Sequence, residues 1–154
     1  LYGWIRGWLG LEQSCLLYAD DETLYTEIID TVGELCYRCT EQVLQHTNAF
    51  DYGHFWEDIC FNSGPIISPK FFDEWIVPRY KRITDLLKKH GCHVSWTDCD
   101  GSITPIVPQF LAGGINCMFP IEAAHTDPLK LRLDHGKNAL LMGGVDKKAL
   151  AGGR

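Results

Sequence analysis

The chain has 154 residues, of which 45% are hydrophobic and 22% are charged, with 14 Lys+Arg against 20 Asp+Glu. This composition is typical of a folded globular domain and excludes extended disorder, collagen-like repeats and coiled coils. A long uncharged stretch, residues 103–121, is interrupted by Pro105 and Pro108, so no membrane-spanning segment is predicted. The net charge of −6 argues against nucleic acid as a partner.

The charged residues are unevenly distributed. Residues 1–77 carry 3 basic and 13 acidic side chains, whereas residues 78–154 carry 11 basic and 7 acidic ones.

The 7 cysteines are scattered and lie mostly in apolar segments, which predicts free, buried thiols in a reducing compartment. We therefore expect a cytoplasmic protein. Cys36 and Cys39 have CxxC spacing, but they lie in a predicted helix without a second pair, which favours an ordinary helix face over a metal or redox site.

Helical and strand patterns alternate along the chain. Asp20 or Asp21 can cap the first helix, Ser68-Pro69 is a cap followed by proline at the first helical position, and Asp127-Pro128 repeats that signal. Pro78 is expected to divide the second helix. The pattern predicts, in chain order, a helix over 21–46, a strand over 49–58, a helix over 70–90, a strand over 92–98, a short helix over 104–112, a strand over 115–122, a helix from 127 to about 136, a strand over 139–146 and a helix start at 147–150.

This alternation indicates βα units around a parallel sheet and therefore the α/β class. The strands are short and apolar, as in parallel sheets that are covered on both faces. A closed (β/α)8 barrel typically needs about 250 residues. The chain can therefore form about half of a TIM-type barrel, although the pattern alone also allows a small open α/β sheet.

Each predicted strand ends in acid. The carboxylates are Glu57 with Asp58, Asp98 with Asp100, Glu122, and Asp146. The carboxyl ends of parallel strands form the functional edge of an α/β fold, here termed the carboxyl edge, so these groups are expected to converge there. Carboxylates placed together need protons, a cation or basic partners. The alternative for Asp100, Asp127 and Asp146 taken singly is that they cap helices.

Other residues near the strand ends are candidates for ligand contact. His54 lies within the first strand and can line the carboxyl edge. Trp96 can form a wall for a planar ligand, or pack in the core. Cys99, with Cys92 and His93, can supply zinc ligands from one strand and its loop, but no further ligand pair is evident.

Four segments together resemble the uroporphyrinogen decarboxylase family. They are Ser-Pro-Lys-Phe-Phe-Asp-Glu-Trp-Ile-Val-Pro-Arg-Tyr at 68–80, Trp-Thr-Asp-Cys-Asp-Gly at 96–101, Phe-Pro-Ile-Glu at 119–122 and Gly-Gly-Val-Asp-Lys at 143–147. The resemblance covers nearly the whole chain and is strongest over about 56–151. It implies one partial TIM-type barrel domain over residues 1–154, lacking the first strands and the last unit, and with them the catalytic groups that those parts carry. The piece alone is therefore expected to be inactive.

The resemblance implies a lyase of the decarboxylase type that acts on a small molecule without a cofactor. We expect Asp98, Asp100 and Glu122 to be acid–base groups or ligands of a divalent metal, and Asp58 to orient the substrate. Glu57, His54, Trp96 and Asp146 complete the expected substrate site. Uroporphyrinogen carries eight carboxylates and an acidic carboxyl edge would repel it, so a neutral or cationic substrate is expected instead.

Two alternatives remain. The family also includes corrinoid-dependent methyltransferases, which act with a corrinoid protein and use a His-x-Cys pair to bind zinc. Thr97 stands at the histidine position here, before Asp98 and Cys99. The other alternative is a non-catalytic barrel fragment that forms a homo-oligomer, since half a barrel leaves two open strand edges.

Overall fold

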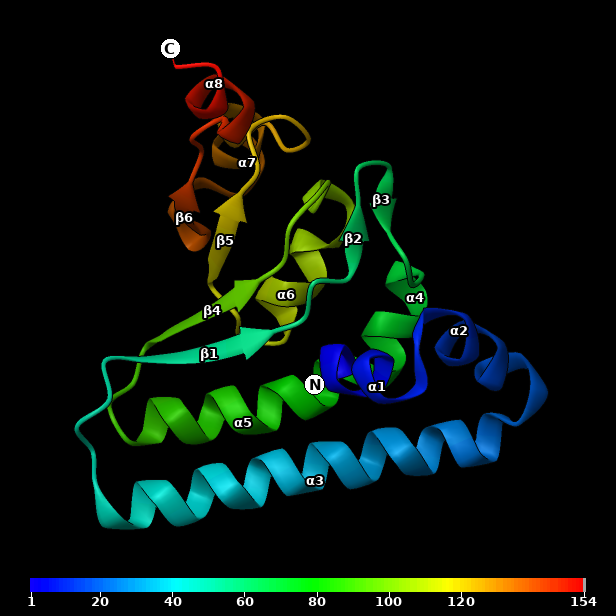
Figure 1. Cartoon of the computed structure of the whole chain (residues 1–154). Coiled ribbons are helices and arrows are strands. Elements are labelled where there is room, and N and C mark those ends of the chain that lie inside the picture. The colour runs from blue at the N-terminus through cyan, green and yellow to red at the C-terminus, as the bar shows by residue number, and fades with distance from the viewer. Residues whose placement is uncertain (154) are drawn as a thin grey trace.

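A four-stranded parallel sheet forms the centre of the chain (Figure 1). The computed structural model describes residues 1–153. The strands lie in the order in which the chain makes them: β1 (Tyr52–Trp56), β4 (Val94–Asp98), β5 (Cys117–Ile121) and β6 (Leu140–Gly143). Each lies within one of the four predicted strands, so the predicted α/β class and its parallel sheet are confirmed.

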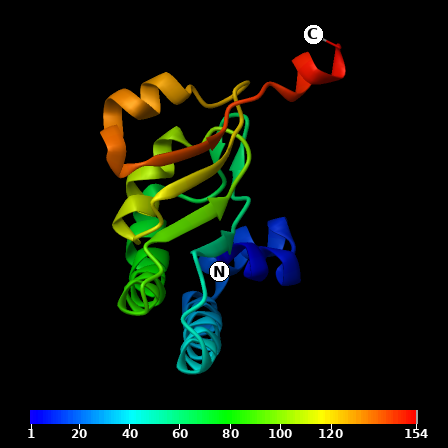
Figure 2. The same cartoon turned by 90° about the vertical axis from the view of Figure 1, so that its left-hand side faces the viewer.

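The helices that connect the strands lie on one side of the sheet (Figures 1 and 2). They are α5 (Val77–Lys89) between β1 and β4, α6 (Val107–Ala112) between β4 and β5, and α7 (Pro128–His135) between β5 and β6. Helix α3 (Glu22–His46) precedes β1 and packs on α5, whereas α8 (Lys147–Ala151) follows β6 and lies apart from these helices in Figure 2. Short 3-10 turns at Thr104–Ile106 and Gly136–Asn138 complete these connections.

Three predicted helix caps are confirmed. Asp21 accepts a hydrogen bond from the Leu24 amide at 2.9 Å, Ser68 from the Phe71 amide at 3.1 Å, and Asp127 from the Leu129 amide at 2.8 Å. Each cap satisfies an amide that the first helical turn leaves without a partner.

The helix predicted over 70–90 is divided, but ahead of Pro78. It consists of α4 (Pro69–Phe71), a π-helical turn (Phe72–Ile76) and α5. The Val77 amide donates to the Phe72 carbonyl, five residues earlier. Proline has no backbone N–H to donate and is therefore accommodated in the first turn of a helix. The π-helical turn accordingly ends before Pro78, and α5 begins at the residue before it.

Four elements were not predicted. They are α1 (Tyr2–Leu9), α2 (Leu11–Asp20) and the two-stranded hairpin of β2 (Cys60–Phe61) and β3 (Gly64–Pro65). No side chain caps α1 or α2. Helix α1 packs against the end of β1 because Gly3 has no side chain: a Cβ atom there would lie 2.7 Å from the Trp56 carbonyl oxygen.

The two faces of the sheet differ. Gly53 packs against Leu87, and Phe55 contacts the Tyr80 ring at 5.2 Å between centroids, so this face lies on the helices. The alternate residues of the strands lie on the opposite side, here termed the open face: Tyr52, His54, Trp56, Trp96, Phe119, Leu140 and Met142. Parallel sheets are normally covered on both faces, whereas on this open face the residues of β1 and β6 are exposed and those of β4 and β5 are half-buried or buried.

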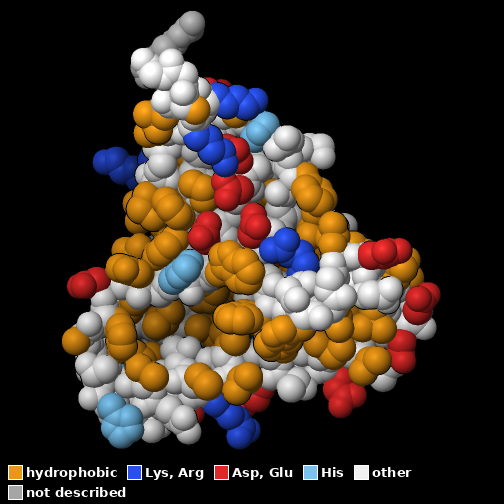
Figure 3. All heavy atoms as spheres, in the orientation of Figure 1, with side chains coloured by type: hydrophobic (Ala, Val, Ile, Leu, Met, Phe, Trp, Pro, Cys, Tyr) orange, Lys and Arg blue, Asp and Glu red, His pale blue; other side chains and the backbone are white. Residues whose placement is uncertain are grey.

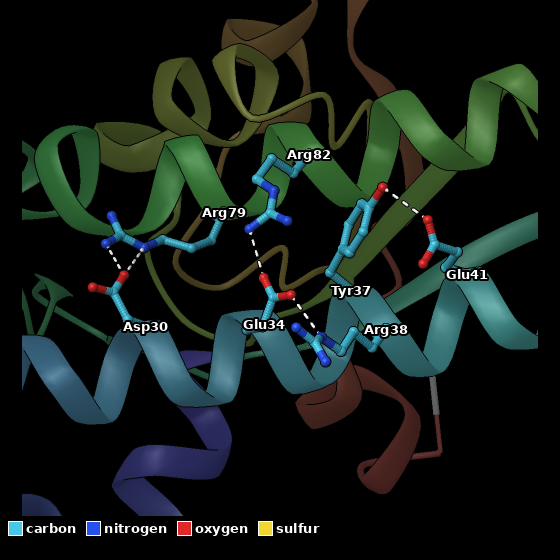
Figure 4. Close-up of polar contacts among 7 residues, drawn as sticks. All are labelled: Asp30, Glu34, Tyr37, Arg38, Glu41, Arg79 and Arg82. Carbon is cyan, nitrogen blue, oxygen red and sulfur yellow. Dashed lines mark hydrogen bonds and ion pairs between the residues drawn. The ribbon is translucent and has the colours of Figure 1, made fainter.

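Polar contacts join α3 to α5 on the outside of the molecule (Figure 4). Asp30 pairs with Arg79, and Glu34 pairs with Arg82 at 2.9 Å. The Arg82 guanidinium lies 4.3 Å from the centroid of the Tyr37 ring, a cation–π geometry. These contacts fix α3 along α5 and so place its other side beside the free edge of β1.

The helices of residues 1–153 do not have the character of membrane spans. None of them combines the length and the apolar composition that crossing a bilayer needs.

Candidate functional site

Asp98 occupies the centre of the carboxyl edge. It is the last residue of β4, and it follows Trp96 by two positions, so both side chains belong to the open face. Its carbonyl accepts the amides of Glu57 and Asp58, both at 3.0 Å, which joins the end of β1 to the end of β4. Asp58 reaches this position with φ of 47°, a left-handed conformation that Asp tolerates better than most residues.

The surroundings of Asp98 favour its protonated form. Burial raises the pKa of its carboxyl group, and the negative charges of Asp100 and Asp58 add to that effect. His54 acts in the opposite direction. The His54 ring stacks on the Trp96 ring with 4.0 Å between centroids and 9° between planes. Asp98 therefore lies beside an aromatic surface and a second group able to carry a proton.

Lys147 joins the neighbouring carboxylates. Its amine lies 2.9 Å from Glu122 and 3.3 Å from Asp100. Glu122 also accepts the Gly101 amide at 2.8 Å, and His125 lies 3.8 Å away. The hydrogen bond from Lys147 is the main cause that lowers the pKa of Glu122, whose side chain is only 12% exposed. The surroundings thus favour the anionic form of Glu122, whereas those of Asp98 raise the pKa of its carboxyl group.

Glu57 follows β1 at the carboxyl edge, but its side chain does not join the other carboxylates there, contrary to prediction. Its side chain is fully buried and accepts the Gly3 amide at 2.9 Å and the Leu1 nitrogen. Burial and then the charge of Glu57 raise the pKa of Tyr80, which lies in the core. The carboxylate therefore holds the start of α1 on the end of β1. Sequence analysis missed this role because α1 itself was not predicted.

Asp58 has a basic partner that was also missed. The Arg6 guanidinium lies 3.6 Å from its carboxylate, and it lies 6.0 Å from the Trp56 ring centroid. Arg6 is one of only 3 basic residues in the acidic first half of the chain. That scarcity was the available signal for a counter-ion.

Asp146 caps α8, accepting the Lys148 amide at 2.8 Å. The capping interpretation therefore holds for Asp146 as it does for Asp127, and neither side chain has a contact with the other strand-end carboxylates among those described in residues 1–153. For Asp100 the observed partner is Lys147 instead. The edge thus brings together Asp58, Asp98, Asp100 and Glu122 of the predicted set.

Cys99 lies in the core with no exposed surface. A hydrogen bond with Cys60, and then burial, raises the pKa of its thiol. A thiol held protonated is a poor metal ligand, because metals bind the thiolate. In the described part of the chain, no three His, Cys, Asp or Glu side chains are placed to hold a metal ion. His93 is exposed and Cys92 is buried beside the Val94 carbonyl, away from any shared site.

The arrangement offers the carboxyl group of Asp98 with its raised pKa, two carboxyl groups bridged by Lys147, and an aromatic surface. Such a set can bind a small molecule against the Trp96 side and exchange a proton with it. Comparisons with protein-family models, with curated proteins and with solved structures find no match to the chain.

Proposed function

We propose that the chain forms part of a TIM-type barrel enzyme of the uroporphyrinogen decarboxylase type, with Asp98 as its proton-transferring group. The observation that carries this proposal is the placement of Asp98 at a strand end, on the open face, with a pKa raised by burial and by neighbouring charge. Perturbed acids at the carboxyl edge of a parallel sheet are typical of catalytic groups.

The strand order supports the barrel. Strands that follow one another in sequence, with their helices on one side, are the repeating unit of a (β/α)8 barrel, whereas doubly wound sheets have helices on both faces. In such a barrel the open face becomes the packed interior. The side chains of Trp96 and Phe119, with ring centroids 5.0 Å apart, then form the floor of the substrate site.

The proposed chemistry uses the chain's own groups. When a carboxylate leaves as carbon dioxide, the electrons of the broken carbon–carbon bond stay on the substrate carbon, which must then take up a proton. The protonated Asp98 carboxyl group can donate that proton. Lys147 bridges Glu122 and Asp100 and so holds the adjoining loop.

Charge restricts the substrate. The edge contains four carboxylates, Asp58, Asp98, Asp100 and Glu122, and their paired cations are Arg6 and Lys147. The balance remains negative when Asp98 is ionised, so a polyanion is repelled. An aromatic carboxylic acid that is zwitterionic or cationic overall fits better, with its ring on Trp96.

A ligand panel tests the proposal. Zwitterionic, cationic and polyanionic aromatic carboxylic acids, the last including uroporphyrinogen, are titrated into the chain while the Trp96 indole resonance is followed by NMR, and carbon dioxide release is measured with the complete barrel enzyme of which the chain is proposed to be a part. We expect zwitterionic or cationic acids to bind at Trp96 in the chain and to be decarboxylated by the complete enzyme, in which Asp98→Asn should reduce release about 100-fold or more.

Asp146→Asn is the matched control, because it removes the same charge at another strand end and Asn also caps helices. It should leave binding and carbon dioxide release unchanged. The proposal is overturned if no acid shifts the Trp96 resonance, or if Asp98→Asn behaves like the control.

A further inference from the structure

A cavity of about 160 Å³ lies among α1, α2, the start of α3 and the segment that joins β3 to α4. It shares no lining residue with the carboxyl edge or with the open face. Of the described residues that line it, none is charged. Its walls include the side chains of Tyr2, Tyr18, Tyr25, Phe71, Ile66 and Ile67.

The ring of Phe71 contacts the three tyrosine rings of the cavity. Its centroid lies 6.4 Å from that of Tyr2, 5.1 Å from that of Tyr18 and 5.6 Å from that of Tyr25. The rings of Tyr2 and Tyr18 meet it edge to face, at interplanar angles of 72° and 76°. Aromatic rings favour this geometry, so a further ring that enters the cavity can join the cluster in the same way.

The π-helical turn after α4 separates Phe71 from its neighbour. Phe72, the first residue of that turn, packs in the core on the rings of Tyr80 and Phe110. Phe71, the last residue of α4, packs on the tyrosines of the cavity instead. Turns of this kind occur frequently at functional sites, and this one adjoins the cavity.

The floor of the cavity contains hydroxyl groups. Tyr2, Ser14 and Tyr25 are buried there, whereas Cys15 and Tyr18 are exposed and form part of the mouth. The Tyr2 hydroxyl is buried and has no hydrogen-bond partner within residues 1–153: those of Ser14 and Tyr25 are near it, but neither forms a hydrogen bond with it. A buried hydroxyl without a partner is unfavourable, and a polar ligand atom at the floor would remove that cost.

Both tyrosines at the floor are kept neutral. Burial raises the pKa of Tyr2 and that of Tyr25, so each retains its phenolic proton at neutral pH and can donate it to an acceptor. The surface near the mouth is apolar, because Leu11 and Leu16 of α2 are exposed. Figure 3 shows hydrophobic side chains over the region of α1 and α2.

The size of the cavity indicates the size of its ligand. Apolar cavities of about 150 Å³ bind benzene, and this cavity has nearly that volume with hydroxyl groups added at the floor. We propose that it binds a small neutral aromatic molecule with one hydroxyl group, of which phenol is the simplest. The ring packs on Phe71 and the tyrosines, and the hydroxyl oxygen accepts a hydrogen bond from Tyr2. A charged ligand is disfavoured, because the described lining residues supply no opposite charge.

This site is separate from the one around Asp98. The inference does not depend on the reaction proposed for Asp98, because it rests on residues of α1, α2, α3 and α4 that take no part in that reaction.

Protection of Cys15 from alkylation tests the site. Phenol is titrated into the intact chain, and the rate of modification by iodoacetamide is measured for each cysteine by peptide mass spectrometry. We expect phenol to slow the alkylation of Cys15 with a Kd of about 1 mM or below. Cys39 is the internal control, since it is also exposed but does not line this cavity, and its rate should stay unchanged.

Tyr2→Phe isolates the hydrogen bond. It removes only a hydroxyl that has no partner in residues 1–153, so the fold should be retained, as circular dichroism checks. Phenol should bind this variant about tenfold more weakly, whereas toluene, which has the ring without the hydroxyl, should bind it at least as well as wild type. Tyr37→Phe is the matched control: it removes the same group from a tyrosine of α3 outside the cavity and should leave phenol binding unchanged.

Four results would overturn the proposal. Phenol leaves Cys15 unprotected, or it slows Cys15 and Cys39 alike. Tyr2→Phe binds phenol as tightly as wild type does. Tetramethylammonium protects Cys15 more strongly than phenol, which would show a cation site on the aromatic rings. Phenol shifts the Trp96 resonance without protecting Cys15, which would place its binding at the carboxyl edge.

Discussion

Asp98 and Glu122 end neighbouring strands, yet their carboxyl groups differ in charge behaviour. Burial and the adjacent acids raise the pKa of Asp98, whereas the hydrogen bond from Lys147 lowers the pKa of Glu122. Sequence position alone predicts two equivalent carboxylates. The difference arises from Lys147, which reaches Glu122 across 25 residues of chain and Asp100 across 47. One carboxyl group is therefore suited to donate a proton and the other to remain an anion.

Two substitutions of Glu122 distinguish the contribution of its ion pair with Lys147 from that of its hydrogen bond with Gly101. Glu122→Gln keeps an oxygen for the Gly101 amide and loses the ion pair with Lys147, whose side chain is 66% exposed, so we expect a loss of less than about 1 kcal/mol in the free energy of unfolding. Glu122→Ala also leaves the Gly101 amide without its acceptor and should cost about 1–3 kcal/mol more. Urea denaturation at neutral pH measures both.

Acid should weaken the contribution of Glu122. Its pKa is lowered in the folded chain, so the stability that it contributes is present above its ordinary pKa of about 4.3 and is lost as the pH falls through the folded value. The difference in stability between wild type and Glu122→Gln should shrink in that acid range. Equal losses for Gln and Ala at neutral pH would contradict the account of the Gly101 contact.

The helix-capping aspartates could be predicted from residue type and position, whereas the role of Glu57 depends on a contact distant in the sequence. Asp127 and Asp146 were recognised as cap candidates because aspartate precedes a helix start in both cases, and both cap helices. Glu57 follows β1 as Asp98 ends β4, but it is buried under α1. That difference depends on a long-range contact with Gly3, for which the local pattern holds no signal.

At the scale of elements, the loop after β4 depends on a glycine. Gly101 has φ of 86°, and a Cβ atom there would lie 2.7 Å and 2.8 Å from the carbonyl oxygens of Phe61 and Cys60. Thr126 donates to the Gly101 carbonyl at 2.8 Å and accepts the Ile103 amide at 3.1 Å. The hairpin and the loops after β4 and β5 therefore meet at this residue, next to Asp100.

Gly101→Ala should destabilise the chain by about 2 kcal/mol or more, because it adds both left-handed strain and a clash with backbone oxygen atoms. Gly7→Ala is the control: Gly7 lies in α1, where an added Cβ atom would have nothing within 4 Å, and the change should stabilise by about 0.5–1 kcal/mol. Thermal unfolding compares the two variants. A neutral Gly101→Ala would mean that the hairpin does not pack against this loop.

The elements with a strong local signal were predicted well. Apolar runs ending in acid located all four strands of the sheet, and caps followed by proline located α4 and α7. Helices α1 and α2 escaped prediction because neither has a side-chain cap and because glycines interrupt the first. Their position is set by packing on Trp56 and Glu57, which only the folded chain brings near.

At the scale of the whole molecule, the sheet has one face on its helices and one open face. The proposed barrel accounts for this asymmetry, because it explains why the strands run in sequence and what becomes of the open face. In such a barrel Asp98 would lie at the end of a packed interior. Removing water from the open face would disfavour its charged form further.

The account predicts how Asp98 affects stability. A folded-state pKa above the ordinary value means that the folded chain holds the proton more tightly than the unfolded chain. The corresponding stability is complete below the ordinary pKa of about 3.9 and is lost as the pH rises through the folded value.

The measurement that tests the central claim most directly is a carbon-13 NMR titration of the Asp98 side-chain carboxyl group in the intact chain, with Asp98→Asn to assign its resonance. The account predicts a midpoint above about 3.9, the ordinary value for aspartate, because burial and the charges of Asp100 and Asp58 favour the protonated form. A midpoint at or below that value would show an ordinary, ionised carboxylate, and would contradict the role of Asp98 as the proton donor.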